Sequence, residues 1–264
     1  MNDHDDLLRA IAANPDEDTP RLVYADFLDE LGGESRTARA EFIRLHTRAE
    51  RLALDDPERE AAKPRISQLL CAWDTVWQQE MPPGWKALAY HRRGFPFRGA
   101  VTASQVEDDD DPRPHLLEYV ELTPDVPPHR LSEILRRSIG PWVKTLIVRS
   151  PLPWSAVYGA LAEADYGLLR SAGAEALASG DYQRLECLDI ARHAIGDEGF
   201  RALCESWGFP QLRELNLNNN NITDFGIATL IRSNLLPQLR RLELSDNPIS
   251  VAMRDRVRPG HGES

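Results

Sequence analysis

The pattern of hydrophobic and polar positions in the second half of the chain repeats at a fixed interval. Three segments that begin at Leu185, Leu212 and Leu239 fit the form LxxLxLxxNxI, and each begins 27 residues after the one before it. His193 stands in the asparagine position of the first segment. This spacing fits neither a helix nor an alternating strand, and it indicates a turn and short strand with the leucines pointing inward. The asparagine then turns the chain and bonds backbone groups that would otherwise be buried without partners.

The residues that follow each short strand indicate a helix. The stretches 195–203 (IGDEGFRAL) and 222–230 (ITDFGIATL) align, so that Gly199 and Gly226 are again 27 residues apart. The stretch 169–177 (LRSAGAEAL) fits the same template. We expect each stretch to form a helix behind its strand, with the glycines allowing close approach. One strand–helix unit cannot bury its own apolar face, so the units are expected to stack.

Weaker copies of the pattern lie upstream, at 143–148 (VKTLIV) and 116–122 (LLEYVEL). The interval from Val143 to Leu185 is 42 residues, so this unit carries an insertion of about 15 residues that we place at 151–167. With these copies the chain holds about five repeats.

Residues 115–257 resemble the ribonuclease-inhibitor-type leucine-rich repeat family, which shares this motif and a period of roughly 20–29 residues. The resemblance implies an α/β solenoid, a horseshoe with parallel strands on its concave side and helices on its convex side. At roughly 4.8 Å per strand, about five strands give an arc only about 20 Å across, which suits a small partner surface.

In the first 80 residues the apolar positions recur with the spacing of amphipathic helices. We expect helices at 5–13, from Thr19 or Pro20 to Gly32, at 36–53 and at 58–80, the last interrupted near Pro64. The buried stripe of the second helix is predicted to consist of Leu22, Val23, Phe27, Leu28 and Leu31.

Three stretches of this region, NPDEDTPRLVYADFLDE at 14–30, RAEFIRLH at 39–46 and HRRGF at 91–95, are similar to the repeat-companion domain. That family occurs at the N-terminus of bacterial proteins that continue into leucine-rich repeats. The resemblance covers residues 1–99, and it departs from the family at Phe27, where tryptophan is expected. It supports the architecture and carries no catalytic residues.

We therefore expect four segments along the chain. They are a helical repeat-companion domain at 1–84, a capping hairpin with an acidic linker at 85–114, leucine-rich repeats at 115–257, and a disordered tail at 258–264.

Composition narrows the class of protein. The chain of 264 residues has a net charge of −11, which argues against a general binder of nucleic acid or anionic membranes. The three cysteines form no CxxC pair, the N-terminus lacks a signal peptide, and no apolar run approaches the length of a membrane span. We expect a reduced, cytoplasmic, soluble protein without a cofactor.

One basic stretch stands out against this acidity. Residues 85–98 (WKALAYHRRGFPFR) interleave aromatic side chains with Arg92, Arg93 and Arg98, which is a pattern suited to single-stranded nucleic acid. The alternative is a hairpin that seals the first repeat and pairs its arginines with the acidic N-terminal helices, where residues 1–35 carry ten acidic side chains against two arginines. We favour the cap.

Two acidic clusters were considered as metal sites. Asp16, Asp18 and Asp26 lack the spacing of a calcium loop and fit a capping turn better. The run 107–111 (EDDDD) with His115 is interpreted as a linker, because prolines follow the acidic run. The helix from Thr19 could instead present Tyr24, Asp26, Asp29 and Glu30 as a docking face.

No nucleophile, phosphate-loop or zinc motif occurs, so we predict a non-enzymatic module that binds a protein. Nucleic-acid binding through 85–98 is the alternative, and a hydrolase using Asp109 or His115 is a third. Positions between the inward leucines should point out of the concave face. The residues predicted to bind a partner there are Tyr119, Glu121, Arg149, Asp189, Glu214, Asn216, Asn218, Arg241 and Glu243.

Overall fold

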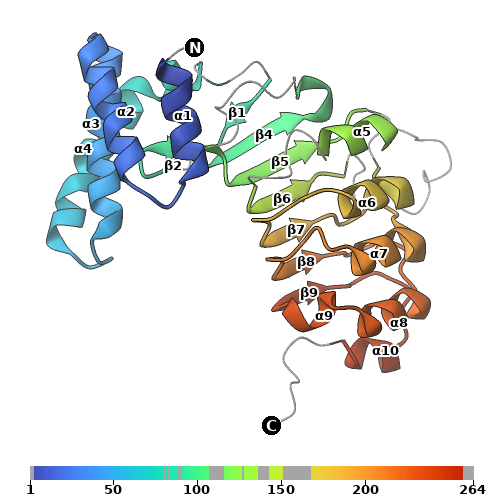
Figure 1. The fold of residues 1–264 in the computed structure, drawn as a ribbon. Helices are drawn as coiled ribbons and strands as arrows, with labels where there is room; N and C mark the ends of the chain where they lie inside the picture. Colours follow the sequence, from blue (N-terminus) through green and yellow to red (C-terminus); the bar gives the residue numbers. More distant parts are fainter. Residues whose placement is uncertain are drawn as a thin grey trace. The chain divides into compact units, whose positions relative to one another are not determined.

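The structure is a computed structural model of the chain, and it describes residues 3–79, 81, 84–88, 91–106, 116–126, 128–135, 143–150 and 168–257. The acidic run 107–111, His115, the predicted insertion 151–167 and the tail 258–264 lie outside the described residues. The chain divides into two compact units, residues 1–100 with 109–118 and residues 101–108 with 119–264. The predicted fold class, α/β with parallel strands after a helical region, is confirmed (Figure 1).

Four helices make up most of the first unit: α1 (Asp3–Ala13), α2 (Thr19–Leu31), α3 (Glu34–Arg51) and α4 (Pro57–Gln78). Each packs against the next one in the sequence. Their bounds lie close to the predicted ones because the stop signals act locally. The chain leaves α2 at two glycines with positive φ, a backbone conformation that other residues adopt only with strain.

The predicted buried stripe of α2 is partly wrong. Val23 is 46% exposed and Leu31 is 50% exposed, whereas Tyr24 is buried and only 5% exposed. Tyr24 packs with Ala25 and Leu28 into the core of the unit. The helix is therefore rotated relative to the prediction, and Tyr24 does not belong to an exposed docking face.

The predicted interruption of the fourth helix is also wrong, because α4 runs without a break through Pro64. A proline inside a helix removes the hydrogen bond to the carbonyl four residues earlier. Here that carbonyl belongs to Glu60, and both Glu60 and Pro64 are exposed, so water can take the place of the lost donor.

Four short strands follow the helices. β1 (Lys86–Ala87) pairs antiparallel with the start of β4 (Arg98–Thr102), and β2 (His91–Arg92) pairs antiparallel with β3 (Phe95–Pro96). Arg93 and Gly94 join β2 to β3, and both have positive φ, as a two-residue type I′ hairpin requires. A Cβ atom at Gly94 would lie 2.5 Å from the Cα atom of Ile43 in α3.

In the second unit, five parallel strands lie side by side in sequence order (Figure 1). They are β5 (Tyr119–Thr123), β6 (Thr145–Val148), β7 (Cys187–Asp189), β8 (Glu214–Asn216) and β9 (Arg241–Glu243). The register places the inward apolar residues opposite one another, so that Leu188 pairs with Leu146 on one side and Leu215 on the other. The motif positions therefore form continuous rows across the sheet.

Helices lie along one side of this sheet (Figure 1). They are α5 (Pro128–Ile134), α6 (Arg170–Ala178), α7 (Gly196–Glu205), α8 (Asp224–Arg232) and α10 (Val251–Asp255), and the short helices η1 (Ala103–Gln105) and α9 (Leu235–Gln238) complete the described elements of the unit. A Cβ atom at Gly199 would lie 2.9 Å from the Cα atom of Ser171, and one at Gly226 would lie 2.5 Å from Asp197. The two glycines thus permit the close approach predicted for them.

The motif asparagines hold successive repeats together through a buried ladder of hydrogen bonds. The Asn220 side chain donates to the carbonyl of Ile190 at 2.8 Å and accepts from the backbone N–H of His193 at 3.0 Å. Asn247 makes the same contacts one repeat later, to Leu217 at 2.9 Å and to the N–H of Asn220 at 2.9 Å. These amides satisfy backbone groups of two neighbouring repeats, as predicted for the motif position.

His193 occupies the same place in the ladder with different chemistry. Its Nε2 lies 2.9 Å from the carbonyl oxygen of Val148, and its Nδ1 lies 3.2 Å from the backbone nitrogen of Leu169. A carbonyl only accepts and an N–H only donates, so the ring is neutral, with its proton on Nε2. Complete burial lowers the pKa of His193 to about 4, which keeps the neutral form at physiological pH.

Candidate functional site

The side chains between the inward apolar positions make up the opposite face of the β5–β9 sheet, which we call the concave face. The strand register arranges them in two rows. The first row runs Tyr119, Thr145, Cys187, Glu214 and Arg241, and the second runs Glu121, Ile147, Asp189, Asn216 and Glu243.

A hollow of about 320 Å³ lies on the concave face. Residues from all five strands line it, with Thr145, Ile147 and Cys187 in its central strands. Each of these three side chains is half-buried, so a partner could still contact them. Of the nine predicted partner-binding residues, Tyr119, Asp189, Glu214, Asn216, Arg241 and Glu243 line the hollow, and Glu121, Arg149 and Asn218 do not.

Two of the four acidic residues on this face are neutralised within it. Arg149 contacts Glu121 at 2.6 Å, and Arg241 contacts Glu243 at 2.5 Å. Glu243 also accepts a hydrogen bond of 3.0 Å from the side chain of Asn218. The concave face is therefore less negative at its two ends than its composition indicates.

The other two acidic residues, Asp189 and Glu214, lie on adjacent strands. Neither forms a salt bridge with any residue in the described ranges. Asp189 accepts hydrogen bonds from Asn216 at 3.1 Å and from the N–H of Ala191 at 3.0 Å, while Glu214 is exposed. Two carboxylates that form no salt bridge with any described residue thus stand beside the half-buried Ile147 and Cys187.

The environment of Cys187 suppresses its reactivity. Burial, followed by the charges of Glu214 and Asp189, raises the pKa of this thiol to about 11. The thiolate is the nucleophilic form of cysteine, so the neutral thiol at pH 7 behaves as a small apolar group. Cys187 therefore contributes contact area to the hollow, in agreement with its sequence position between the inward leucines.

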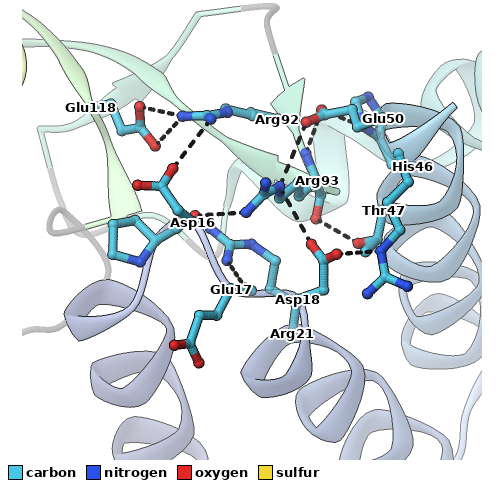
Figure 2. A network of polar contacts seen from close by, with 12 residues as sticks. Asp16, Glu17, Asp18, Arg21, His46, Thr47, Glu50, Arg92, Arg93 and Glu118 are labelled. Atoms are coloured by element: carbon cyan, nitrogen blue, oxygen red, sulfur yellow. Dashed lines mark hydrogen bonds and ion pairs between the residues drawn. The ribbon is translucent and has the colours of Figure 1, made fainter. Parts of the chain in front are cut away.

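Arg92 and Arg93 of the basic stretch belong to a polar network of the first unit (Figure 2). Arg92 contacts both carboxylate oxygens of Glu118, at 2.8 and 2.7 Å, and reaches Asp16 at 3.3 Å. Arg93 lies 3.3 Å from Asp18, and its backbone N–H donates to Glu50 at 2.7 Å. The predicted pairing of these arginines with the acidic N-terminal region is confirmed.

The remaining members of the network come from α2 and α3. Asp18 also pairs with Arg51, and Arg21 donates to the carbonyl of Glu17 at 2.5 Å. Burial and the nearby Arg93 lower the pKa of Arg21 to about 10, so it keeps its charge at neutral pH. Burial acts to raise the pKa of Glu50, but hydrogen bonds from His46 and Arg93 lower it on balance.

This network brings together the three stretches that resemble the repeat-companion domain. Asp16 and Asp18 come from the first stretch, His46 from the second, and Arg92 and Arg93 from the third (Figure 2). The motifs are far apart in the sequence and converge on one hairpin tip. These residues of the three stretches therefore share a structural role in holding that tip.

The aspartates considered for calcium face arginines. Asp16 contacts Arg92, Asp18 contacts Arg93, and Asp26 contacts Arg44 at 2.6 Å. Within the described residues there is no group of three or more His, Cys, Asp or Glu side chains placed to hold a metal ion. The same part of the chain has no helix long and apolar enough to cross a membrane.

Comparison with protein families agrees with the geometry of the second unit. Residues 208–252 match a family model described as Leucine Rich repeats (2 copies), and residues 183–204 match one described as Leucine Rich repeat. A search of curated proteins found no match. The resemblance of residues 1–99 to the repeat-companion domain stays a prediction. The C-terminal part of the chain contains leucine-rich repeats, which are generally non-enzymatic modules for protein–protein interaction.

Proposed function

We propose that the repeats at 115–257 bind a protein partner on the concave face, through the hollow that β5–β9 line. The observation that carries this proposal is the pair Asp189 and Glu214, two carboxylates with no salt bridge in the described part of the chain. A lysine or arginine of a partner would supply the missing counter-charge. The partner segment is therefore expected to be cationic.

The apolar part of the hollow adds a second requirement. Ile147 and Cys187 are half-buried and stand next to the two carboxylates. Contact with an apolar side chain of the partner would remove this surface from water, at roughly 25 cal/mol per Å². We propose a recognition element that places an apolar side chain next to a basic one.

The proposed module is non-enzymatic and cytoplasmic. The raised pKa of Cys187 argues against a nucleophilic thiol on the concave face. The three cysteines occur as free thiols, which fits a reducing compartment. We retain as proposals the domain bounds 1–84, 85–114, 115–257 and 258–264.

An affinity pull-down with two matched variants tests the proposal. Glu214→Arg reverses a charge on the concave face, and Glu205→Arg makes the same change at an exposed position of α7, on the helical side. We expect a protein partner that is retained by wild type and Glu205→Arg and lost from Glu214→Arg. Glu243→Arg should weaken binding of the partner less, because Glu243 already forms a salt bridge with Arg241.

Two results would contradict concave-face binding. Retention of the partner by Glu214→Arg would place the interface elsewhere on the chain. Recovery of nucleic acid alone would favour the stretch 85–98, although Arg92 and Arg93 are engaged in ion pairs.

A further inference from the structure

A second hollow, of about 430 Å³, lies in the first unit. Side chains of α1, α2, α3 and α4 line it, together with Phe95 and Pro96 of β3 and with Met81 and Leu116. Its volume falls within the usual range for small-molecule pockets, roughly 300–1,000 Å³. It shares no residue with the concave face, so the inference below is independent of the proposed function.

Aromatic rings form a continuous wall of this pocket. The ring centroids of Tyr24 and Phe27 are 6.3 Å apart, and those of Tyr24 and Phe95 are 5.7 Å apart. His4 meets Tyr24 edge-on at 5.5 Å, and its Nε2 lies 3.0 Å from the Tyr24 hydroxyl. Such a wall offers large contact area with few rotatable bonds.

The charge of the pocket is opposite to that of the chain. Among the described residues the lining contains Arg36 and Arg39 and no carboxylate, although the chain as a whole has a net charge of −11. Arg39 is buried, with its guanidinium carbon 4.6 Å from the centre of the Trp77 ring. Arg36 is exposed at the rim and donates to the carbonyl of Gly32 at 3.3 Å. The fixed positive charge thus sits beside apolar surface.

Several groups that line the pocket are incompletely packed or lack a hydrogen-bond partner among the described residues. Leu31 lines it and is 50% exposed, and Phe27 is only half-buried. The indole N–H of Trp77 is buried, and no residue in the described ranges accepts a hydrogen bond from it. A buried donor without an acceptor costs roughly 1–3 kcal/mol.

We propose that this pocket binds an amphiphilic carboxylate, an apolar or aromatic group that carries one acidic group. The apolar part packs against Phe27, Leu31 and the aromatic wall. The carboxylate pairs with Arg36 at the rim, with the charge of Arg39 behind it, because an arginine fork matches a carboxylate in geometry and charge. This chemistry is shared by small organic acids and by the C-terminal residue of an apolar peptide.

Protein-observed NMR titrations with octanoate and octanamide test the proposal. These probes share the apolar chain and differ in charge. We expect octanoate to cause saturable shifts of the Trp77 indole signal and to bind about tenfold more tightly than octanamide, since charged hydrogen bonds are stronger than neutral ones. Octanoate that binds no more tightly than octanamide, with saturable shifts from both probes, would overturn the proposal.

Two exposed arginines of α3 provide matched variants. Arg36→Gln removes the rim charge of the pocket, and Arg48→Gln makes the same change outside the lining. Octanoate affinity should fall at least threefold in Arg36→Gln and stay unchanged in Arg48→Gln, while octanamide affinity stays unchanged in both. An equal loss in both variants, with the spectrum of the folded protein preserved, would contradict the assigned role of Arg36.

A peptide that ends in leucine, compared with its C-terminal amide, distinguishes the two possible sources of the carboxylate, a small organic acid and a peptide C-terminus. Binding of the free-acid peptide alone would identify a peptide C-terminus as the ligand. Binding of octanoate alone would identify a small acid. If neither acid binds at Trp77, the proposal is wrong.

Discussion

Each of the two units contains its own polar network, and the two networks are of opposite kinds. In the repeats, Asn220, Asn247 and His193 form a neutral, buried ladder in which each side chain bonds backbone groups of adjacent repeats. In the first unit, Arg92 and Arg93 form a charged, part-exposed network with Asp16, Asp18, Glu50 and Glu118. The residues of the ladder recur every 27 positions in the sequence, whereas the residues of the ionic network follow no period.

This difference has energetic consequences. A buried backbone group that loses its only partner costs the full desolvation penalty, whereas a part-exposed ion pair can be replaced by water and salt. We therefore expect the ladder to dominate stability and to be insensitive to salt. The ionic network should contribute less and weaken as ionic strength rises.

The largest effect is expected from Asn220→Ala. This change removes the acceptor for the N–H groups of His193 and Ile195 and the donor to the carbonyl of Ile190. The free energy of unfolding should fall by about 3–5 kcal/mol, because each orphaned buried group costs roughly 1–3 kcal/mol. Urea unfolding followed by circular dichroism measures this.

Asn218→Ala is the matched control for that variant. Asn218 is the same residue type two positions earlier, and its side chain bonds Glu243 and the N–H of the exposed Ser245. Its loss should cost about 1 kcal/mol or less, since water can replace these contacts. Equal losses in the two variants would contradict the special role of the ladder.

The next largest effect is expected from Gly94→Ala in the hairpin of the first unit. The position has φ of 81°, and a Cβ atom would lie 2.5 Å from the backbone of Ile43. Gly32→Ala is the control, because Gly32 has φ of 67° with nothing within 4 Å of its Cβ position. We expect a loss of about 3 kcal/mol for Gly94→Ala and about 1 kcal/mol for Gly32→Ala.

Thermal or urea unfolding, followed by tryptophan fluorescence, compares these two glycine variants. Both glycines have positive φ and only Gly94 has a close neighbour at its Cβ position, so a larger loss of stability at Gly94 reports the close approach to α3. Indistinguishable unfolding midpoints would mean that the hairpin tip is free to move away from α3.

The third prediction concerns the one titratable group in the ladder. The pKa of folded His193 is about 4, below the ordinary value of about 6.5. As pH falls below 6.5 the unfolded chain binds a proton first, so stability is lost progressively between pH 6.5 and pH 4. The loss in the free energy of unfolding assigned to His193 should be about 3 kcal/mol by pH 4.

His193→Asn removes this contribution and restores the residue type of the motif. His91, whose pKa is lowered to about 3 by burial, acts with the same sign, so the test is the difference between wild type and variant at each pH. The difference should grow from pH 7 to pH 4. A difference that is constant across this range would contradict the neutral, buried state of His193.

The smallest effect is expected from Arg93→Gln. Its ion pairs with Asp18 and Glu50 are partly exposed, so the loss should be about 1 kcal/mol in dilute buffer. The loss should shrink in 1 M salt, where charges are screened within about 3 Å. The loss of stability caused by Asn220→Ala should stay the same in 1 M salt. An equal dependence on salt for the two variants would contradict the proposed difference between the networks.

The same contrast explains how much could be predicted from the sequence. The repeats were predictable because one period of 27 residues fixes the strand, the turn and the buried asparagine together. The strand register then follows, and so do the rows of the concave face. The pairing of Arg149 with Glu121 was not predicted, because it depends on rotamers across two strands.

The errors in the first unit have a common cause. The apolar pattern of α2 permits more than one buried face, and only packing against α1 and α3 selects Tyr24 over Val23 and Leu31. The continuity of α4 through Pro64 likewise depends on exposure, which local propensity does not encode. The hollow lined by Arg36 and Arg39 is formed by side chains of several elements, so it could not be predicted from any single sequence motif.

The most direct test of concave-face binding is site-specific photocrosslinking. p-Benzoylphenylalanine would replace Asn216 on the concave face in one protein and Glu205 on the helical side in another. We predict a discrete protein adduct from position 216 that disappears when Glu214→Arg is added, and no such adduct from position 205. An adduct from position 205 alone, or an adduct from position 216 that survives Glu214→Arg, would contradict capture of a cationic partner on the concave face.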